Sequence, residues 1–168
     1  MISASHVRMM SDYNRWQNES IFGAADQLDA AARDQNRGGF WGSIQGTLSH
    51  LLWGDGMWMS RFDGDPPPEV GMSESPVWMA DWDVLTAARL QMDDRIEAWA
   101  KGQDDIADDD TISFYSGLLG RDVTKSHALC VTHFFNHQTH HRGQAHAMLT
   151  AAGARPGDTD LFVMPDRG

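Results

Sequence analysis

Four segments of the sequence space their apolar residues three or four positions apart, which is the period of a helix with one buried face. They cover about residues 5–31, 43–62, 82–101 and 124–152. Such helices bury their apolar stripes against one another, and 168 residues suffice for one domain with a substantial core but hardly for two. We therefore predict an all-α fold, a four-helix bundle that forms a single domain over residues 1–168.

The connections between these segments differ in length and composition. Residues 63–76, "DGDPPPEVGMSESP", contain three consecutive prolines, so we expect this stretch to be non-helical. Residues 102–110 read as an acidic loop, and the alternating stretch 111–126 predicts a small β-hairpin near residues 111–125. Long connections in a bundle are typical of crossover topologies, and we expect at least one crossover here.

The charge balance excludes some classes of partner. The chain has 24 acidic and 13 basic residues, a formal net charge of −11 at pH 7, so we expect it to bind neither nucleic acid nor an anionic membrane surface. Its one cysteine, Cys130, cannot form a disulfide within the chain, which fits a reducing compartment. The N-terminal residues lack the apolar core of a signal peptide, and no apolar run approaches the ~20 residues that span a bilayer. We expect a soluble cytoplasmic protein.

Histidines are concentrated in the stretch "HFFNHQTHHRGQ", residues 133–144, which holds four of the eight in the chain. On a helix His137 and His141 lie one turn apart inside the apolar stripe, a spacing that suits two adjacent ligand positions on one metal ion. Core histidines hydrogen-bonded to backbone carbonyls give the same pattern, so the pair alone leaves both interpretations open. We expect His133 at the rim of such a site and His140 on the surface.

A third ligand would have to come from another helix. His50 lies on the shoulder of the apolar stripe in the segment 43–62, from which it can reach across a groove to a neighbouring helix. Three neutral imidazoles leave one coordination position open for water or substrate, as in catalytic zinc sites. Periodicity does not establish that the two helices are neighbours, and imidazole ligands suit zinc, nickel, copper or iron(II).

Other polar side chains share these faces. Asp55 lies near the middle of the apolar stripe, where an unpaired carboxylate is costly, and Arg142 is a candidate partner for it. Asp55 could instead orient a ligand imidazole, or lie partly exposed at the helix edge. Gln144 projects close to His137 and can form a hydrogen bond in the pocket.

Three blocks of sequence resemble the DinB family, part of the DinB/YfiT-like metalloprotein superfamily. They are "YNRWQNESIF" (13–22), "IQGTLSHLLWGDGMW" (44–58) and "HFFNHQTHHRGQ" (133–144), and the tail "GARPGDTDLFVMPD" also resembles the end of the family. The resemblance covers nearly the whole chain. It implies a bundle of unusual connectivity and a divalent metal held by His50, His137 and His141. Zinc or nickel is favoured, with iron, manganese and copper as further candidates, and family members are often homodimers.

Two functions follow from this resemblance. The first is a metal-dependent enzyme acting on a small molecule, either a thiol S-transferase like some relatives or a hydrolase. Residues 138–140 supply no glutamate that could act as a general base, which weakens the hydrolase alternative. The second is a non-catalytic metal-binding stress-response protein, working as a dimer. A cavity at the metal would favour the enzyme. The sequence identifies no catalytic residue, and for Cys130 an inert buried thiol is the ordinary interpretation.

Overall fold

Each long helix of the computed structural model, which describes residues 1–166, begins at a side chain that caps its first turn. The helices are α1 (Ala4–Asp26), α3 (Ile44–Phe62), α5 (Trp82–Lys101) and α6 (His127–Ala151). In each case the capping oxygen accepts a hydrogen bond from the backbone N–H three residues later, which satisfies a group that the helix itself leaves unpaired. The caps are Ser3, Ser43, Asp81 and Ser126.

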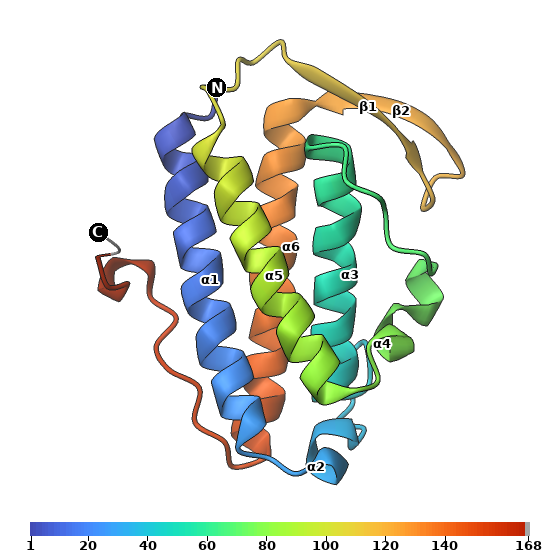
Figure 1. Ribbon diagram of the computed structural model, residues 1–168, viewed down its shortest axis with the longest axis vertical. Coiled ribbons are helices and arrows are strands. Elements are labelled where there is room, and N and C mark those ends of the chain that lie inside the picture. The colour runs from blue at the N-terminus through green and yellow to red at the C-terminus, as the bar shows by residue number, and fades with distance from the viewer. Residues whose placement is uncertain (167–168) are drawn as a thin grey trace.

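The four helices pack as the predicted bundle (Figure 1). Helix α6 packs against α1 and α3, and α5 packs against the same two helices from the other side. Consecutive long helices α1 and α3 are therefore diagonal in the bundle, which is the crossover that the long connections predict. Within residues 1–166 none of the helices is both long and apolar enough to cross a membrane.

Several boundaries differ from the sequence expectation. The first helix ends at Asp26, and a separate short helix α2 (Ala30–Asp34) follows, because the Asp29 carboxylate caps a new first turn at the Ala32 N–H. Helix α6 begins at His127, since residues 124–126 belong to the hairpin.

The connection 63–76, expected to be non-helical, is helical at its end. A 3₁₀ turn η1 (Met72–Glu74) leads into α4 (Ser75–Trp78), where Pro76 stands in the first turn, a position that tolerates the missing N–H. A second 3₁₀ turn, η2 (Leu161–Val163), lies in the tail.

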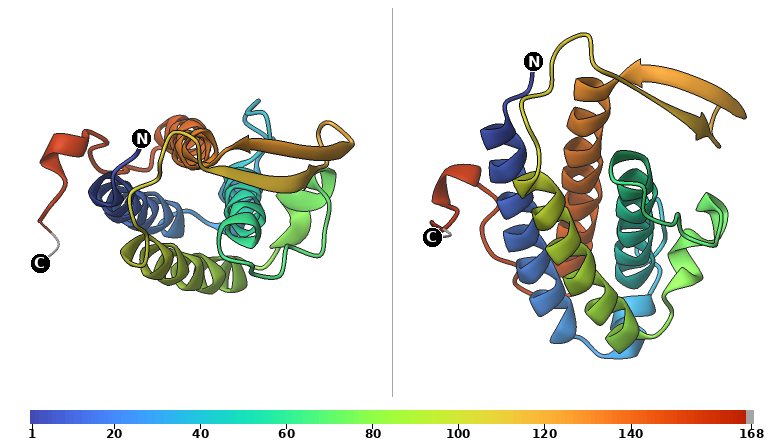
Figure 2. Two further views of the ribbon diagram at one scale, coloured as in Figure 1. Left: turned by 90° about the horizontal axis from the view of Figure 1, so that it is seen from above. Right: turned by 45° about the horizontal axis from the view of Figure 1, so that its top comes forward.

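The predicted hairpin is confirmed. Strands β1 (Thr111–Ser116) and β2 (Arg121–Ser126) pair antiparallel, with Thr111 opposite Ser126. The hairpin lies at the end of the bundle where α3 ends and α6 begins, and it projects sideways beyond the helices (Figure 2). The ring of Phe114 on β1 contacts Trp58 of α3, with the ring centroids 5.6 Å apart, so one strand residue anchors the hairpin to the bundle.

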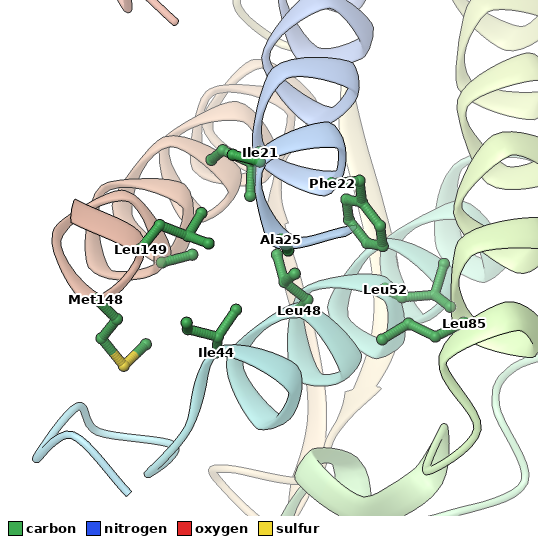
Figure 3. Close-up of a cluster of buried hydrophobic side chains, with 11 residues drawn as sticks. Ile21, Phe22, Ala25, Ile44, Leu48, Leu52, Leu85, Met148 and Leu149 are labelled. Atoms are coloured by element: carbon green, nitrogen blue, oxygen red, sulfur yellow. The ribbon is translucent and has the colours of Figure 1, made fainter. Parts of the chain in front are cut away.

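The core consists of two apolar clusters, one towards each end of the bundle. Figure 3 shows the first cluster, in which Leu48 and Leu52 of α3 meet side chains from all three other long helices. The second cluster gathers around Phe134 of α6 and Trp99 of α5. All four of these side chains are less than 5% exposed, so they bury a large apolar area that stabilises the fold.

A layer of buried polar side chains separates the two clusters. Asp55 of α3 is fully buried and accepts hydrogen bonds from Arg89 Nη1 of α5 at 2.6 Å and Gln138 Nε2 of α6 at 3.0 Å. Arg89 also pairs with Asp93 at 2.9 Å. Asp93 in turn accepts a hydrogen bond from Asn18 of α1 at 2.8 Å, so all four helices take part.

The partner expected for Asp55 was therefore wrong. Its carboxylate pairs with Arg89, whereas Arg142 donates to the side-chain oxygen of Asn14. Arg142 lies in the same layer, and burial lowers its pKa to about 10 although the charge of Asp55 opposes that shift. Arg89 was missed because it lies on another helix, 34 residues along the chain, and the stripe pattern does not reveal which helices meet.

We predict that Asp55→Asn lowers the free energy of unfolding of the metal-free protein by about 3–5 kcal/mol, because it leaves the buried Arg89 guanidinium short of a counter-charge. The measurement is denaturant unfolding followed by circular dichroism. The matched control is Asp63→Asn, which weakens a pair with Arg95 whose side chains are both 43% exposed and should cost less than about 1 kcal/mol. Equal losses in the two variants would contradict the structural role of the layer.

Candidate metal centre

Helices α3 and α6 lie side by side and bring three histidines together. His50 of α3 and His137 and His141 of α6 each offer one ring nitrogen, and these atoms all lie within 4.8 Å of one another. The ring centroids are 4.4 Å apart for His137 and His141, and 4.8 Å apart for His50 and His141. The structure thus supplies the contact between the two helices that periodicity left open.

His50 is held in one orientation by α4. Its Nδ1 lies 2.8 Å from the hydroxyl of Ser75, and that hydroxyl donates its only proton to the backbone oxygen of Met72 at 2.7 Å. The hydroxyl must therefore accept from His50, which puts the imidazole proton on Nδ1 and leaves the Nε2 lone pair free. The ring is stacked between Trp41, at 3.9 Å, and Trp53, at 5.6 Å.

His141 is oriented by its own helix. Its Nδ1 lies 2.9 Å from Oε1 of Gln144, an atom that only accepts, so Nδ1 carries the proton and the Nε2 lone pair is free. The amide nitrogen of Gln144 lies 3.1 Å from Nε2 of His140. Gln144 therefore contacts the cluster through His141 and not, as its position on the helix suggested, through His137.

His137 has neither kind of support. Its Nδ1 is buried and has no hydrogen-bond partner within residues 1–166. The ring lies against Gly54 of α3, where a Cβ would stand 2.6 Å from the Cε1 atom of His137. Gly54 thus leaves room for the imidazole ring, and the nitrogen without a partner is available to a metal ion. The three histidines fit a divalent ion.

The cluster keeps its imidazoles neutral. Burial lowers the pKa of His50 to about 3, and the neighbouring His141 adds to the shift. Burial and the adjacent histidines lower the pKa of His137 to about 3 as well, and burial lowers the pKa of His141. A neutral imidazole is the form that binds a metal, so at pH 7 no proton competes for these nitrogens.

A comparison with known proteins now adds to this geometry. The sequence model of the DinB family matches residues 3–167. The chain belongs to the DinB family. No curated protein matches the sequence. Membership in the DinB family confirms the resemblance drawn from the three sequence blocks, and the observed bundle agrees with it.

The remaining candidates occupy different positions in this DinB-family bundle. His133 is exposed and lies beside the cluster, with its ring centroid 5.9 Å from that of His137. Asp55 and Arg142 belong to the polar layer, so Asp55 orients no ligand imidazole directly. Cys130 is buried and its thiol pKa is raised by burial, which makes it an inert thiol at neutral pH.

Two contributors escaped the sequence analysis for different reasons. Gly54 left a signal, because an isolated glycine inside a helical pattern often marks close approach of another group. Ser75 left none, because it follows the proline run and reaches His50 from 25 residues away.

Two hollows in the described residues lie away from the histidines. One of ≈ 390 Å³ lies between α1, α6 and the tail and is lined by Tyr13 and Arg142, among others. The other, of ≈ 230 Å³, lies beside Leu52 and Met92. Neither of these two hollows lies at the cluster, where His137 is half-buried and His50 and His141 are buried.

We predict that Gly54→Ala weakens metal binding about 10- to 100-fold, because the new methyl group displaces the His137 ring from its position. The dissociation constant for Zn²⁺ or Ni²⁺, measured by competition with a chelator, checks this. The control is Gly23→Ala in α1, where an added Cβ meets nothing within 4 Å; it should leave the metal affinity unchanged. Wild-type affinity in Gly54→Ala would exclude His137 as a ligand.

Proposed function

We propose that this DinB-family protein binds one divalent metal ion through His50, His137 and His141 and uses it as an enzyme acting on a small molecule. The observation that carries the proposal is the state of the three rings. Burial lowers the pKa of all three, two have their proton fixed on Nδ1 by a hydrogen bond, and the third has a buried nitrogen without a partner within residues 1–166. Most buried side-chain nitrogens of core residues have a hydrogen-bond partner, and a metal ion would supply one here.

The number of ligands favours catalysis over a structural role. Among the described residues the cluster contains three metal-binding side chains and no fourth histidine, cysteine or carboxylate. Structural zinc sites are closed by four protein ligands, whereas catalytic sites keep one position open. Zinc or nickel is the ion we favour, with iron, manganese and copper as further candidates. Imidazole nitrogens bind zinc, nickel, iron and copper readily, whereas manganese prefers oxygen ligands.

The chemistry of the surroundings favours a thiol over water as the nucleophile. A divalent ion on three imidazoles lowers the pKa of a thiol or of water and so supplies a nucleophile at neutral pH. Hydrolysis also needs a general base, yet Asp55 is fully buried and bound to Arg89 and Gln138. We therefore place a thiol S-transferase-like reaction ahead of a hydrolase.

The second candidate is a non-catalytic metal-binding stress-response protein, working as a homodimer. The burial of His50 and His141, with His137 half-buried beside them, is the observation that favours it. The two functions differ in the accessibility of the metal ion. In an enzyme an added thiol can reach the ion, whereas in a closed binding protein it cannot.

We predict about one ion per chain in untagged, exhaustively dialysed protein, and loss of that ion in His50→Ala, His137→Ala and His141→Ala. Metal content is measured by mass spectrometry. His6→Ala, an exposed histidine at the start of α1, is the control and should keep the ion. Metal absent from the wild type, or kept in all four variants, would remove the basis of the proposal.

We also predict that Ser75→Ala and Gln144→Leu weaken metal binding about 10- to 100-fold without abolishing it, since each frees one ligand ring to rotate or change tautomer. Thr150→Ala serves as the control, because its hydroxyl bonds only the backbone oxygen of His146. Affinities measured by chelator competition test this prediction, and unchanged values would mean that the hydrogen bonds do not orient the ligands.

A further inference from the structure

Arg61, near the end of α3, is held between two aromatic rings. Its guanidinium carbon lies 4.5 Å from the centre of the Trp58 ring and 4.3 Å from the centre of the Phe114 ring on β1. The two rings stand nearly perpendicular to each other, with their centroids 5.6 Å apart, so the guanidinium lies in the corner between them, held by cation–π contacts. The N–H groups that the rings do not cover can bind a ligand.

No ion pair within residues 1–166 compensates the charge of Arg61. Within residues 1–166 the ion pairs of arginine involve Arg15, Arg89 and Arg95, and no carboxylate pairs with Arg61. Burial lowers its pKa, and only Cys130 opposes that shift. A half-buried cation without an acidic partner is unusual in a chain with a net charge of −11.

A chain of contacts along α3 and α6 connects Arg61 to the metal cluster. The ring centroid of Trp58 lies 5.1 Å from that of His133, and His133 lies 5.9 Å from His137. The step from His133 to His137 is four residues of one helix, about 6 Å along its axis. Arg61, Trp58, His133 and His137 thus form a row of partly exposed side chains, which we call the arginine row.

We propose that Arg61 binds an anionic oxygen group, such as a carboxylate, on the small molecule whose other end reaches the metal. The ligand class that fits the arginine row has a metal-binding head at the histidines, an apolar middle against Trp58 and a terminal anion at Arg61. This inference rests on the proposed function, because it needs a metal at the histidine cluster, and it specifies the substrate of that site.

The test compares two thiols of equal length, one ending in a carboxylate and the other in a neutral hydroxyl group. Protein loaded with Ni²⁺ is titrated with 6-mercaptohexanoate and with 6-mercaptohexan-1-ol, and binding is followed by the sulfur-to-nickel charge-transfer absorption. Each thiol releases its proton to the buffer on binding. We expect the wild type to bind the acid at least about tenfold more tightly than the alcohol, the gain typical of a hydrogen bond to a charged group.

Three variants make the comparison specific. Arg61→Gln should bring the affinity for the acid down to that for the alcohol, and Arg61→Lys should keep part of the preference because it keeps the charge. Arg95→Gln, which removes an arginine already paired with Asp63 and Asp65, should keep the full preference. Circular dichroism and nickel content establish that each variant is folded and loaded, and Arg61→Lys carries the test if Arg61→Gln does not fold.

The possible outcomes separate the two proposals. Equal affinity for the two thiols in the wild type, or a preference that persists in Arg61→Gln, overturns the role of Arg61 and leaves the metal site intact. A protein that binds nickel but neither thiol contradicts the open position in the proposed function, and the inference about Arg61 falls with it. A preference lost in Arg61→Gln and kept in Arg95→Gln supports both.

Discussion

The buried pair between Asp55 and Arg89 determines how the helices align. Its carboxylate is fully buried and is satisfied by Arg89 from α5 and Gln138 from α6. A shift of either helix by one turn would leave a charge without its partner, at a cost of several kcal/mol. The pair therefore fixes the register of α3 against two neighbours, a constraint that apolar packing alone imposes less strictly.

The same register places the metal centre. Asp55 is next to Gly54 in α3, and Gln138 is next to His137 in α6. The hydrogen bond between Gln138 and Asp55 points inwards, and one residue away on each helix His137 rests against Gly54. Because the two contacts share a register, the polar layer that aligns the bundle also brings the imidazoles within ligand distance of one another. The buried polar residues next to the site thus hold the three imidazoles in position, as a preorganised metal centre requires.

Local signals in the sequence predicted the helices and the pair His137 and His141, and the family resemblance added His50, but neither predicted the long-range contacts. Periodicity predicted the long helices, and the spacing of His137 and His141 placed both on one face. The break after Asp26 was missed because the apolar period continues to Leu28 while the cap at Asp29 starts a new helix. The bond from His50 to Ser75 and the pair of Asp55 with Arg89 join different elements, and one sequence contains no record of such pairings.

The charge of Arg61 determines which end of a ligand the arginine row would bind. An acidic chain lowers the local concentration of anions over most of its surface, and this repulsion acts within about one Debye length, ~8–10 Å at physiological salt. Arg61, which contacts two aromatic rings and has no paired carboxylate within residues 1–166, locally reverses that field one helical turn from Trp58, the neighbour of His133. The hairpin contributes Phe114 to this arrangement. This contact gives a structural role to an element that projects from the bundle and makes few other contacts with it. Selectivity for a ligand with a distant negative charge would then come from a single cation and not from the shape of a cavity.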